Sequence, residues 1–427
     1  MDEKDYKTSD RREFLKKASL ISLSTIGLSY CGKENKIESK IYNDRELPGS
    51  SRIMSYRSLG KTGLKVSDIS FGAGGLFDHK LALRAIELGV NYFDTAPDYG
   101  SGKSEINLGK ALKEMSGSRN KVVITSKLCR LGGYPSHMYN EKKETYISAV
   151  EGSLKRLQTD YIDFILVHAL GEKDSNSNEV NRLKDSEMLS AVEKLKKDGK
   201  IRYVGVSCHN YNAGLGGGVD YAIDSSKFDL VMLAYNFKGH ASDRKTLASI
   251  IKLSRKAHNK GLAFVAMKTL KGAKGLDSST LEGKGTYAQA AFKWVLSNPA
   301  ISCLVVTMKD YDEINEYVKA SGQKFSYNDK KILYQAASYL DKECQIGCSA
   351  CEPACPEGVK VSDILRYNMY FKNYDQEKHA MLKYSYLPES MRVKKCNDCE
   401  CACEKVCPYG VAVKSKLIEA HDNLSFA

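Results

Sequence analysis

The run DYIDFILVH at residues 160–168 is apolar along most of its length and ends in a histidine. Before it lie the short apolar run VVITSK at residues 122–127 and then residues 144–157, whose apolar side chains recur at helical spacing. Short, nearly continuous apolar runs are typical of strands that are buried on both faces, as in parallel sheets. This part of the chain therefore predicts a strand, a helix and a second, parallel strand.

The same alternation extends in both directions from this unit. Helix-length amphipathic stretches also occupy residues 187–197, 245–260 and 287–296, and residues 56–66 predict an N-terminal hairpin. Candidate strands occupy residues 68–72, 92–95, 122–127, 162–168, 201–207, 229–236, 263–268 and 303–308. Eight strands that alternate with helices predict an α/β fold of the (β/α)8 TIM barrel type.

An open, doubly wound sheet is the alternative fold. Such sheets bind dinucleotides through a G-x-G-x-x-G turn after the first strand. Residues 72–77 read GAGGLF and lack the third glycine. The sequence therefore favours the barrel.

Length and charge limit the classes of function. The chain has 427 residues, of which 42% are hydrophobic, so it is long enough for one large core and additional modules. Its formal charge is +13, but Lys and Arg are mixed with Asp and Glu along the helical stretches. No basic run interleaved with aromatic residues occurs, so we expect no nucleic-acid partner. No stretch has the roughly 18 to 20 apolar residues that span a membrane.

The first residues form a segment of their own. RREFLKK at residues 11–17, followed by a weakly apolar run, resembles a twin-arginine export signal, and an amphipathic helix is the alternative. LSYC at residues 28–31 resembles a lipoprotein cleavage box, although Tyr30 is bulky for that position, so a lipid anchor on Cys31 remains open. The expected organisation is a signal at residues 1–31, a linker at 32–54, the barrel at 55–325 and a tail at 326–427. The signal implies a periplasmic or membrane-anchored protein.

Four side chains stand where the active sites of such barrels lie, just beyond the carboxyl ends of strands. Asp94 ends the second predicted strand, and Tyr99 follows in the next loop. Lys127 ends the third strand and His168 ends the fourth. We predict that these four residues form the catalytic site.

These residues resemble the Asp, Tyr, Lys, His tetrad of the aldo/keto reductase superfamily. GKSEINLG at residues 102–109 and GKIRYVGVS at residues 199–207 are similar to two further segments of that family, and the resemblance covers about residues 56–321. It implies hydride transfer between NAD or NADP and a small carbonyl or alcohol substrate: an aldehyde, a ketone or a sugar-like compound.

The chemistry of the four residues agrees with this implication. A tyrosine with a pKa near ~10 is a poor acid or base at neutral pH. We expect Lys127 to lower the pKa of Tyr99, and Asp94 to hold the buried ammonium in place. His168 is expected to donate a hydrogen bond to the substrate oxygen.

The resemblance also implies a cofactor site. Tyr235 takes the position that stacks on the nicotinamide, and Ser207 the position that touches its carboxamide. Along the pyrophosphate and near the ribose phosphate we expect Lys268, Thr269, Leu270, Met308 and Lys309. Asp310 would repel a 2′-phosphate and Lys309 would offset it, so the choice between NAD and NADP stays open.

The tail contains nine of the thirteen cysteines. They occur in the runs CQIGCSACEPACP at residues 344–356 and CNDCECACEKVCP at residues 396–408. Both runs resemble the bacterial C-x2-C-x2-C-x3-C-P pattern, in which the last cysteine binds the other cluster. Each run departs from that pattern by one residue.

The resemblance implies two 4Fe-4S clusters. The first would be bound by Cys344, Cys348, Cys351 and Cys407, and the second by Cys396, Cys399, Cys403 and Cys355. Cys401 is either a substitute ligand or a spectator. Zinc tetrathiolate sites are the alternative, and disulfides are disfavoured because the cysteines are so closely spaced. The intervening residues 361–384 predict a helix packed against the barrel and resemble the linker of ferredoxin-tailed aldo/keto reductases.

The sequence as a whole predicts an exported oxidoreductase whose clusters exchange electrons with a redox partner protein. One alternative is a non-catalytic redox-sensing or binding subunit, against which the complete tetrad argues. The other is a simple cytoplasmic reductase with structural clusters.

Overall fold

The computed structural model describes residues 52–425, except residues 116–118, 133–135, 172–178, 210–216, 238–243, 271–284, 340–343, 345–347, 375, 394–395 and 397–398. The predicted export signal and Cys31 lie outside the described residues. Within the described part of the chain, no helix has the length and apolar character needed to cross a membrane.

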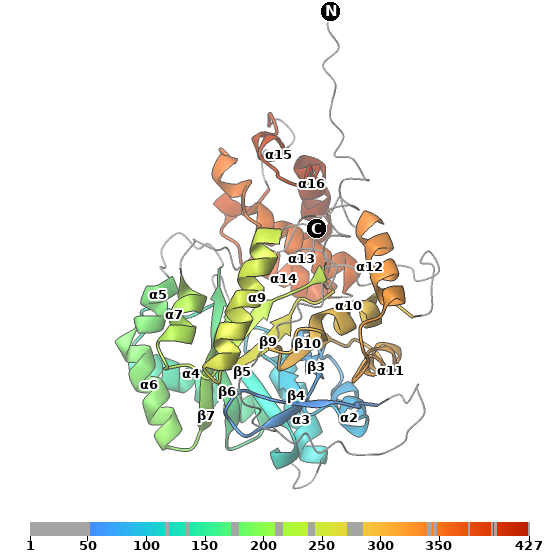
Figure 1. Ribbon diagram of the computed structural model, residues 1–427. Coiled ribbons are helices and arrows are strands. Elements are labelled where there is room, and N and C mark those ends of the chain that lie inside the picture. The colour runs from blue at the N-terminus through green and yellow to red at the C-terminus, as the bar shows by residue number, and fades with distance from the viewer. Residues whose placement is uncertain are drawn as a thin grey trace, which may run out of the picture.

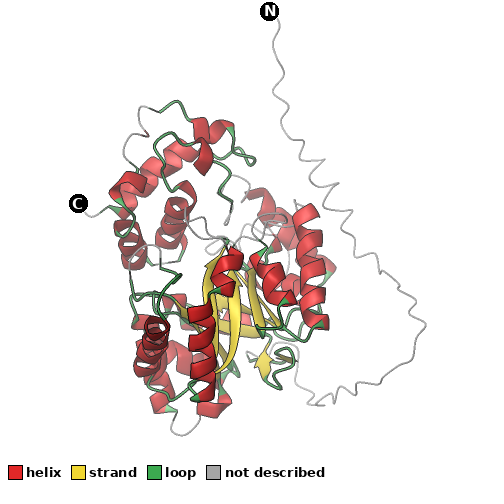
Figure 2. Cartoon of the chain, turned by 90° about the vertical axis from the view of Figure 1, so that its left-hand side faces the viewer, coloured by secondary structure: helices red, strands yellow, loops and turns green. Residues whose placement is uncertain are grey.

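Eight parallel strands close into a barrel, which confirms the predicted fold (Figures 1 and 2). In barrel order the strands are β3 (Ile69–Gly72), β4 (Tyr92–Asp94), β5 (Val123–Leu128), β6 (Ile162–Leu170), β7 (Ile201–Cys208), β8 (Leu230–Ala234), β9 (Ala263–Met267) and β10 (Cys303–Thr307). β10 pairs with β3 and closes the ring.

Alternation of side chains along each strand builds two cores. In β6, Phe164 and Leu166 belong to the inner cluster of the barrel, whereas Ile165 and Val167 belong to the outer cluster beneath the helices. One face of β6 packs inside the barrel and the other packs beneath the helices. All nine residues of the strand are therefore buried.

Helices surround the barrel (Figure 2). They are α2 (His79–Glu87), α3 (Lys103–Glu114), α4 (Lys143–Leu157), α5 (Glu179–Lys184), α6 (Ser186–Lys197), α7 (Gly218–Asp224), α9 (Arg244–Asn259), α10 (Tyr287–Leu296), α11 (Tyr311–Val318) and α12 (Tyr327–Tyr339). Several of these helices begin with a side chain that caps the first turn. Asp185 accepts hydrogen bonds from the first turn of α6, and Asp310 accepts one from the first turn of α11.

An antiparallel hairpin of β1 (Tyr56–Ser58) and β2 (Lys65–Ser67) precedes the barrel, as predicted. Leu59 and Val66, both fully buried, join the inner cluster of the barrel. The hairpin therefore closes the amino end of the barrel and leaves the carboxyl end for the site.

The tail forms a second helical lobe with a core of its own (Figure 1). Its helices are α13 (Val361–Asn373), α14 (Glu377–Ser385), α15 (Ala402–Lys405) and α16 (Val413–Leu424), with short 3-10 turns at η4 (Glu352–Ala354) and η5 (Glu389–Met391). The helical character expected for residues 361–384 is confirmed, but the stretch is divided into two helices, α13 and α14. The amide of Gln376 donates to the carbonyl of Tyr370, six residues back instead of the four of an α-helix, so the helical ladder is interrupted and α14 starts anew after it.

Candidate active site

Asp94 and Lys127 form a buried ion pair at the carboxyl end of the barrel. Lys127 Nζ donates to Asp94 Oδ1 at 2.7 Å and to the carbonyl of Thr95 at 2.8 Å. Lys127 is 2% exposed and Asp94 is 4% exposed. An isolated charge would be costly at this depth, and the contact between the two side chains offsets that cost.

Tyr99 lies against this pair. Lys127 Nζ is 4.6 Å from the centre of the Tyr99 ring. The structure corrects the expectation that Lys127 lowers the pKa of Tyr99. Burial, first of all, and then the carboxylates of Asp94 and Asp98 raise this pKa well above its usual value. The charge of Lys127 is already balanced by Asp94, so the phenol stays protonated.

His168 lies at an irregular point of β6. The pairing of β6 with β7 shifts register between Val167 and Leu170, and Ala169 has a φ of 59°, in the left-handed region. Such bulges commonly redirect a side chain beside an active site. The redirected His168 ring places Nδ1 3.2 Å from Ser207 Oγ, which also accepts from the amide of Ala169 at 3.1 Å.

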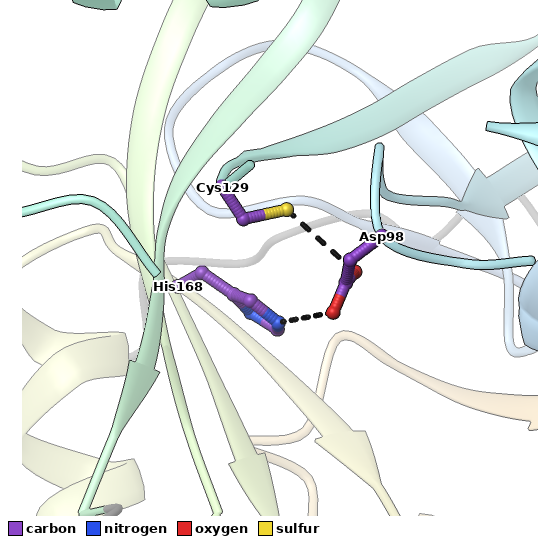
Figure 3. A group of neighbouring side chains, drawn as sticks. All are labelled: Asp98, Cys129 and His168. Atoms are coloured by element: carbon purple, nitrogen blue, oxygen red, sulfur yellow. Dashed lines mark hydrogen bonds and ion pairs between the residues drawn. The ribbon is translucent and has the colours of Figure 1, made fainter. Parts of the chain in front are cut away.

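The other side of the His168 ring faces Asp98 (Figure 3). His168 Nε2 is 3.8 Å from Asp98 Oδ2, and the Cys129 thiol lies 3.6 Å from Asp98 Oδ1. These three side chains are buried, and one potential ligand atom from each lies within 4.8 Å of the others. The carboxylate already has a cation, however, because Lys383 Nζ donates to Asp98 Oδ2 at 2.7 Å. We therefore interpret the group as a hydrogen-bonded and ion-paired network.

Lys383 belongs to α14, so this contact joins the tail to the barrel. Burial alone would raise the pKa of Asp98, but the Lys383 ammonium and the neighbouring His168 lower it well below its usual range. Asp98 is therefore a carboxylate at neutral pH.

A hollow opens beside Asp94 and Tyr99. Residues of the barrel and of the tail line it together: Gly72, Gly74, Asp94, Tyr99, Met267, Lys268, Thr269, Leu270, Val305, Val306, Thr307, Tyr370, Tyr374, Gln376 and His379. The last four belong to α13, α14 and the turn between them, so the tail forms the roof of the hollow. At Gly75 the approach is so close that an added Cβ would lie 2.8 Å from Gln376 Nε2.

Three of the predicted cofactor residues, Lys268, Thr269 and Leu270, line this hollow. Thr269 is buried, and its hydroxyl finds no hydrogen-bond partner within the part of the chain that the structure describes. Lys268 has a φ of 57°, an uncommon conformation for a side-chain-bearing residue, and its Nζ donates to the Tyr370 hydroxyl at 2.8 Å. A buried, unpaired hydroxyl beside a lysine fits a phosphate-bearing ligand.

The remaining predicted cofactor residues lie elsewhere. Tyr235 is 3% exposed and stacks on Trp294, with ring centres 4.9 Å apart, and it is not among the residues lining the hollow. Met308 is fully buried in the outer core, and Lys309 is exposed, its amide bonded to Glu313. The binding of a nicotinamide cofactor by Tyr235, Met308 and Lys309 stays a prediction.

Asp98, Lys383 and His379 were not identified as site residues from the sequence. Asp98 directly precedes Tyr99, a position that could have drawn attention to it. Lys383 and His379 are brought to the barrel only by the docking of the tail, and no local pattern marks them. Burial chiefly, and also the charge of Lys383, lowers the pKa of His379 to about 4, so this imidazole is neutral in the roof of the hollow.

The tail cysteines gather in and around the second core. Cys351 and Cys403 are buried in that core, and Cys344, Cys355, Cys396 and Cys407 pack against the core as a whole. Burial and then the charges of Cys344, Glu352 and Cys348 raise the pKa of Cys351 to about 12. Burial and then Cys355, Cys399 and Cys403 raise the pKa of Cys396 to about 11. Among the described residues, no three cysteine sulfurs lie within 4.8 Å of one another.

Comparison with known proteins agrees with this architecture. Residues 77–282 match the Aldo/keto reductase family. L-galactose dehydrogenase of Arabidopsis thaliana is 35% identical over 161 residues, which cover 35% of this chain and 47% of that protein. A probable voltage-gated potassium channel subunit beta of the same plant is 36% identical over 123 residues, covering 27% of this chain and 37% of that protein. The chain thus spans less than half the length of these curated relatives.

A solved structure extends the likeness to the whole barrel. The holo form of an aldo-keto reductase from Bacillus halodurans superimposes with a TM-score of 0.51 and 23% identity, over 66% of this chain and 96% of that one. This similarity concerns the fold alone. The likeness in sequence to the Aldo/keto reductase family covers residues 77–282, slightly less than half of the chain.

Proposed function

We propose that this chain is an NAD(P)-dependent oxidoreductase that reduces a small carbonyl compound to an alcohol. The observation that carries the proposal is the buried Asp94–Lys127 pair against Tyr99, at the edge of a hollow at the carboxyl end of the barrel. A protonated phenol held beside a buried cation suits the transfer of a proton to a developing alkoxide.

The hollow fits the cofactor. Lys268, Thr269 and Leu270 would hold a nicotinamide dinucleotide, because they line the hollow and the Thr269 hydroxyl is buried without a partner among the described residues. When bound, the nicotinamide supplies the hydride. Tyr99 supplies the proton, and Lys127 stabilises the phenolate that remains while Asp94 fixes the ammonium.

Tyr99 is in the protonated form that reduction of a carbonyl requires. A phenol whose pKa is raised by burial and by two carboxylates holds its proton at neutral pH. It can give that proton to an alkoxide, which is far more basic, but is a poor base toward an alcohol. A sugar-like substrate is supported by the relative named L-galactose dehydrogenase and by the polar, aromatic lining that the tail provides.

The test is turnover with purified protein. NADH and NADPH should each be supplied with a panel of aldehydes, ketones and aldoses, and the loss of reduced nicotinamide followed together with alcohol formation. We expect carbonyl-dependent oxidation of one of the two nucleotides. Tight nucleotide binding without turnover on any carbonyl would instead favour a redox-sensing or binding subunit, an alternative consistent with the relative named as a channel subunit.

We further propose that the tail binds two 4Fe-4S clusters that exchange electrons with a partner protein. The support is the pair of cysteine runs and the proximity of Cys355 to Cys396 and Cys403, since the shared assignment requires the last cysteine of one run to meet the other run. The cysteines of both runs lie in and around one core, so clusters bound by them would also stabilise the fold of the tail.

Metal analysis and electron paramagnetic resonance test this assignment. Cys355→Ser should damage the cluster bound mainly by the second run, and Cys407→Ser the cluster bound by the first. Cys303→Ala, in the barrel, is the matched control and should leave the iron content unchanged. Cys401→Ser decides whether that residue is a ligand. Two zinc ions without acid-labile sulfide would contradict the electron-transfer proposal.

We also propose export by the twin-arginine route, on the evidence of residues 11–17. That route carries folded proteins and is therefore compatible with clusters inserted before export. Replacing Arg11 and Arg12 by Lys should leave a folded precursor in the cytoplasm, and undiminished export would mean that another signal acts. Cys31→Ala tests the lipid anchor separately, since a mature protein that stays on the membrane without this thiol must be anchored elsewhere.

A further inference from the structure

Lys383 is the point at which the tail reaches the polar network around His168. Its ammonium donates to Asp98 Oδ2 at 2.7 Å, and the same oxygen lies 3.8 Å from His168 Nε2. The side chain of Asp98 is 4% exposed, that of His168 5% and that of Lys383 16%. The two cationic or potentially cationic groups therefore share one carboxylate in a site from which water is largely excluded.

Charge balance decides what His168 does in this arrangement. A buried carboxylate that lacked the ammonium would draw a proton onto the neighbouring imidazole, and the ring would close from 3.8 Å to hydrogen-bond distance. With Lys383 in place the carboxylate is already neutralised. The imidazole then has less tendency to take up a proton, and its Nδ1 lies 3.2 Å from Ser207 Oγ.

We propose that Lys383 of the tail is a positioning residue for His168, acting through the shared carboxylate of Asp98. The catalytic role of His168 rests on the proposed function, whereas the coupling of the three side chains does not. Lys383 itself touches neither hollow nor reacting atoms, since the residues lining the hollow do not include it. The tail would then influence His168 through Lys383, in addition to lining the hollow.

Other titratable groups around the pair must be considered in any pH measurement. Asp98 is faced by Cys129 from the end of β5, and its charge acts on Tyr99 and His379. The ring of His209 lies 6.1 Å from that of His168, edge to face. Arg182, a buried permanent cation, donates to the backbone carbonyls of His168 and Ala169, and it stays in place when Lys383 is replaced. The removal of Lys383 should therefore change the charge that acts on Asp98 and, through it, on His168.

The direct test follows the His168 ring by nuclear magnetic resonance as a function of pH, with its signals assigned by comparison with His168→Gln. In Lys383→Met the imidazole should titrate about one pH unit or more higher than in the unmodified protein, because a nearby positive charge no longer opposes protonation. Lys383→Arg should restore the original titration. Lys372→Met is the matched control, since Lys372 is an exposed lysine of the same module that pairs with Glu419.

A double variant keeps the test decisive if Lys383→Met folds poorly. Asp98→Asn combined with Lys383→Met removes both charges, so His168 should return toward its original titration. An unchanged His168 titration in Lys383→Met, with the tail still docked by limited proteolysis, would overturn the proposal. So would an equal shift in Lys372→Met.

Kinetics separate the coupling from the proposed function. If the chain reduces carbonyls, Lys383→Met should lower kcat/KM for the carbonyl about tenfold or more and leave the Kd of the nucleotide unchanged. If the unmodified protein reduces no carbonyl, the proposed function fails, while the His168 titration still decides whether Lys383 acts through Asp98.

Discussion

Lys127 Nζ and Asp94 Oδ1 lie 2.7 Å apart, and their side chains are 1% and 6% exposed. Removing one partner of such a pair leaves an uncompensated buried charge, whereas exposed pairs contribute little. The pair is therefore both the electrostatic centre of the site and a point at which the fold is sensitive to substitution.

Lys127→Met should lower the free energy of unfolding by about 3 to 5 kcal/mol, because the Asp94 carboxylate stays buried and loses the ammonium that pairs with it. Urea denaturation measures this change. Lys194→Met removes a lysine whose pair with Asp198 lies at the surface, and it should leave the urea midpoint nearly unchanged. Equal effects of the two substitutions would mean that water reaches the Asp94 site.

Tyr99→Phe tests the proton donor. Only the hydroxyl is lost, so the fold and nucleotide binding should persist while carbonyl turnover falls by about 10²-fold or more. Tyr311→Phe is the control, because Tyr311 is 46% exposed at the start of α11. Turnover that survives in Tyr99→Phe would assign the proton transfer to another group.

His379 predicts a pH dependence of stability. Burial, chiefly, lowers its pKa from 6.5 to about 4 in the folded state, so the unfolded chain binds a proton at higher pH than the folded chain does. The contribution to stability is present above about pH 6.5 and is lost as the pH falls toward 4, by about 3 kcal/mol in total. His379→Gln should flatten the stability curve in that window, as measured by urea midpoints at several pH values. A curve of unchanged slope would place the acid sensitivity elsewhere.

The barrel could be predicted because its evidence is local. Each strand is a short apolar run, and β6 shows the pattern most completely because it is buried along its whole length. The positions of Asp94 and Lys127 followed from strand ends, since the carboxyl ends of parallel strands meet at one face. The break between α13 and α14 was missed because residues 361–384 keep helical spacing of apolar side chains across it.

The relationships that depend on docking could not be predicted. Lys383 and Asp98 are separated by 285 positions in the sequence, and no spacing rule joins them. The prediction that the pKa of Tyr99 is lowered was wrong for a related reason. It counted the charge of Lys127 but not the burial and the two carboxylates that oppose it.

The central claim is that the site beside Tyr99 reduces a carbonyl by hydride transfer from a nicotinamide, and the fate of a labelled hydrogen tests it most directly. A single turnover should be run with nicotinamide carrying deuterium at the transferable position, and the alcohol analysed by mass spectrometry. We predict one deuterium on the carbinol carbon with the unmodified protein, and almost no product from Tyr99→Phe in the same time. An alcohol formed without deuterium, its new hydrogens all from solvent, would contradict the account and assign the electrons to the tail.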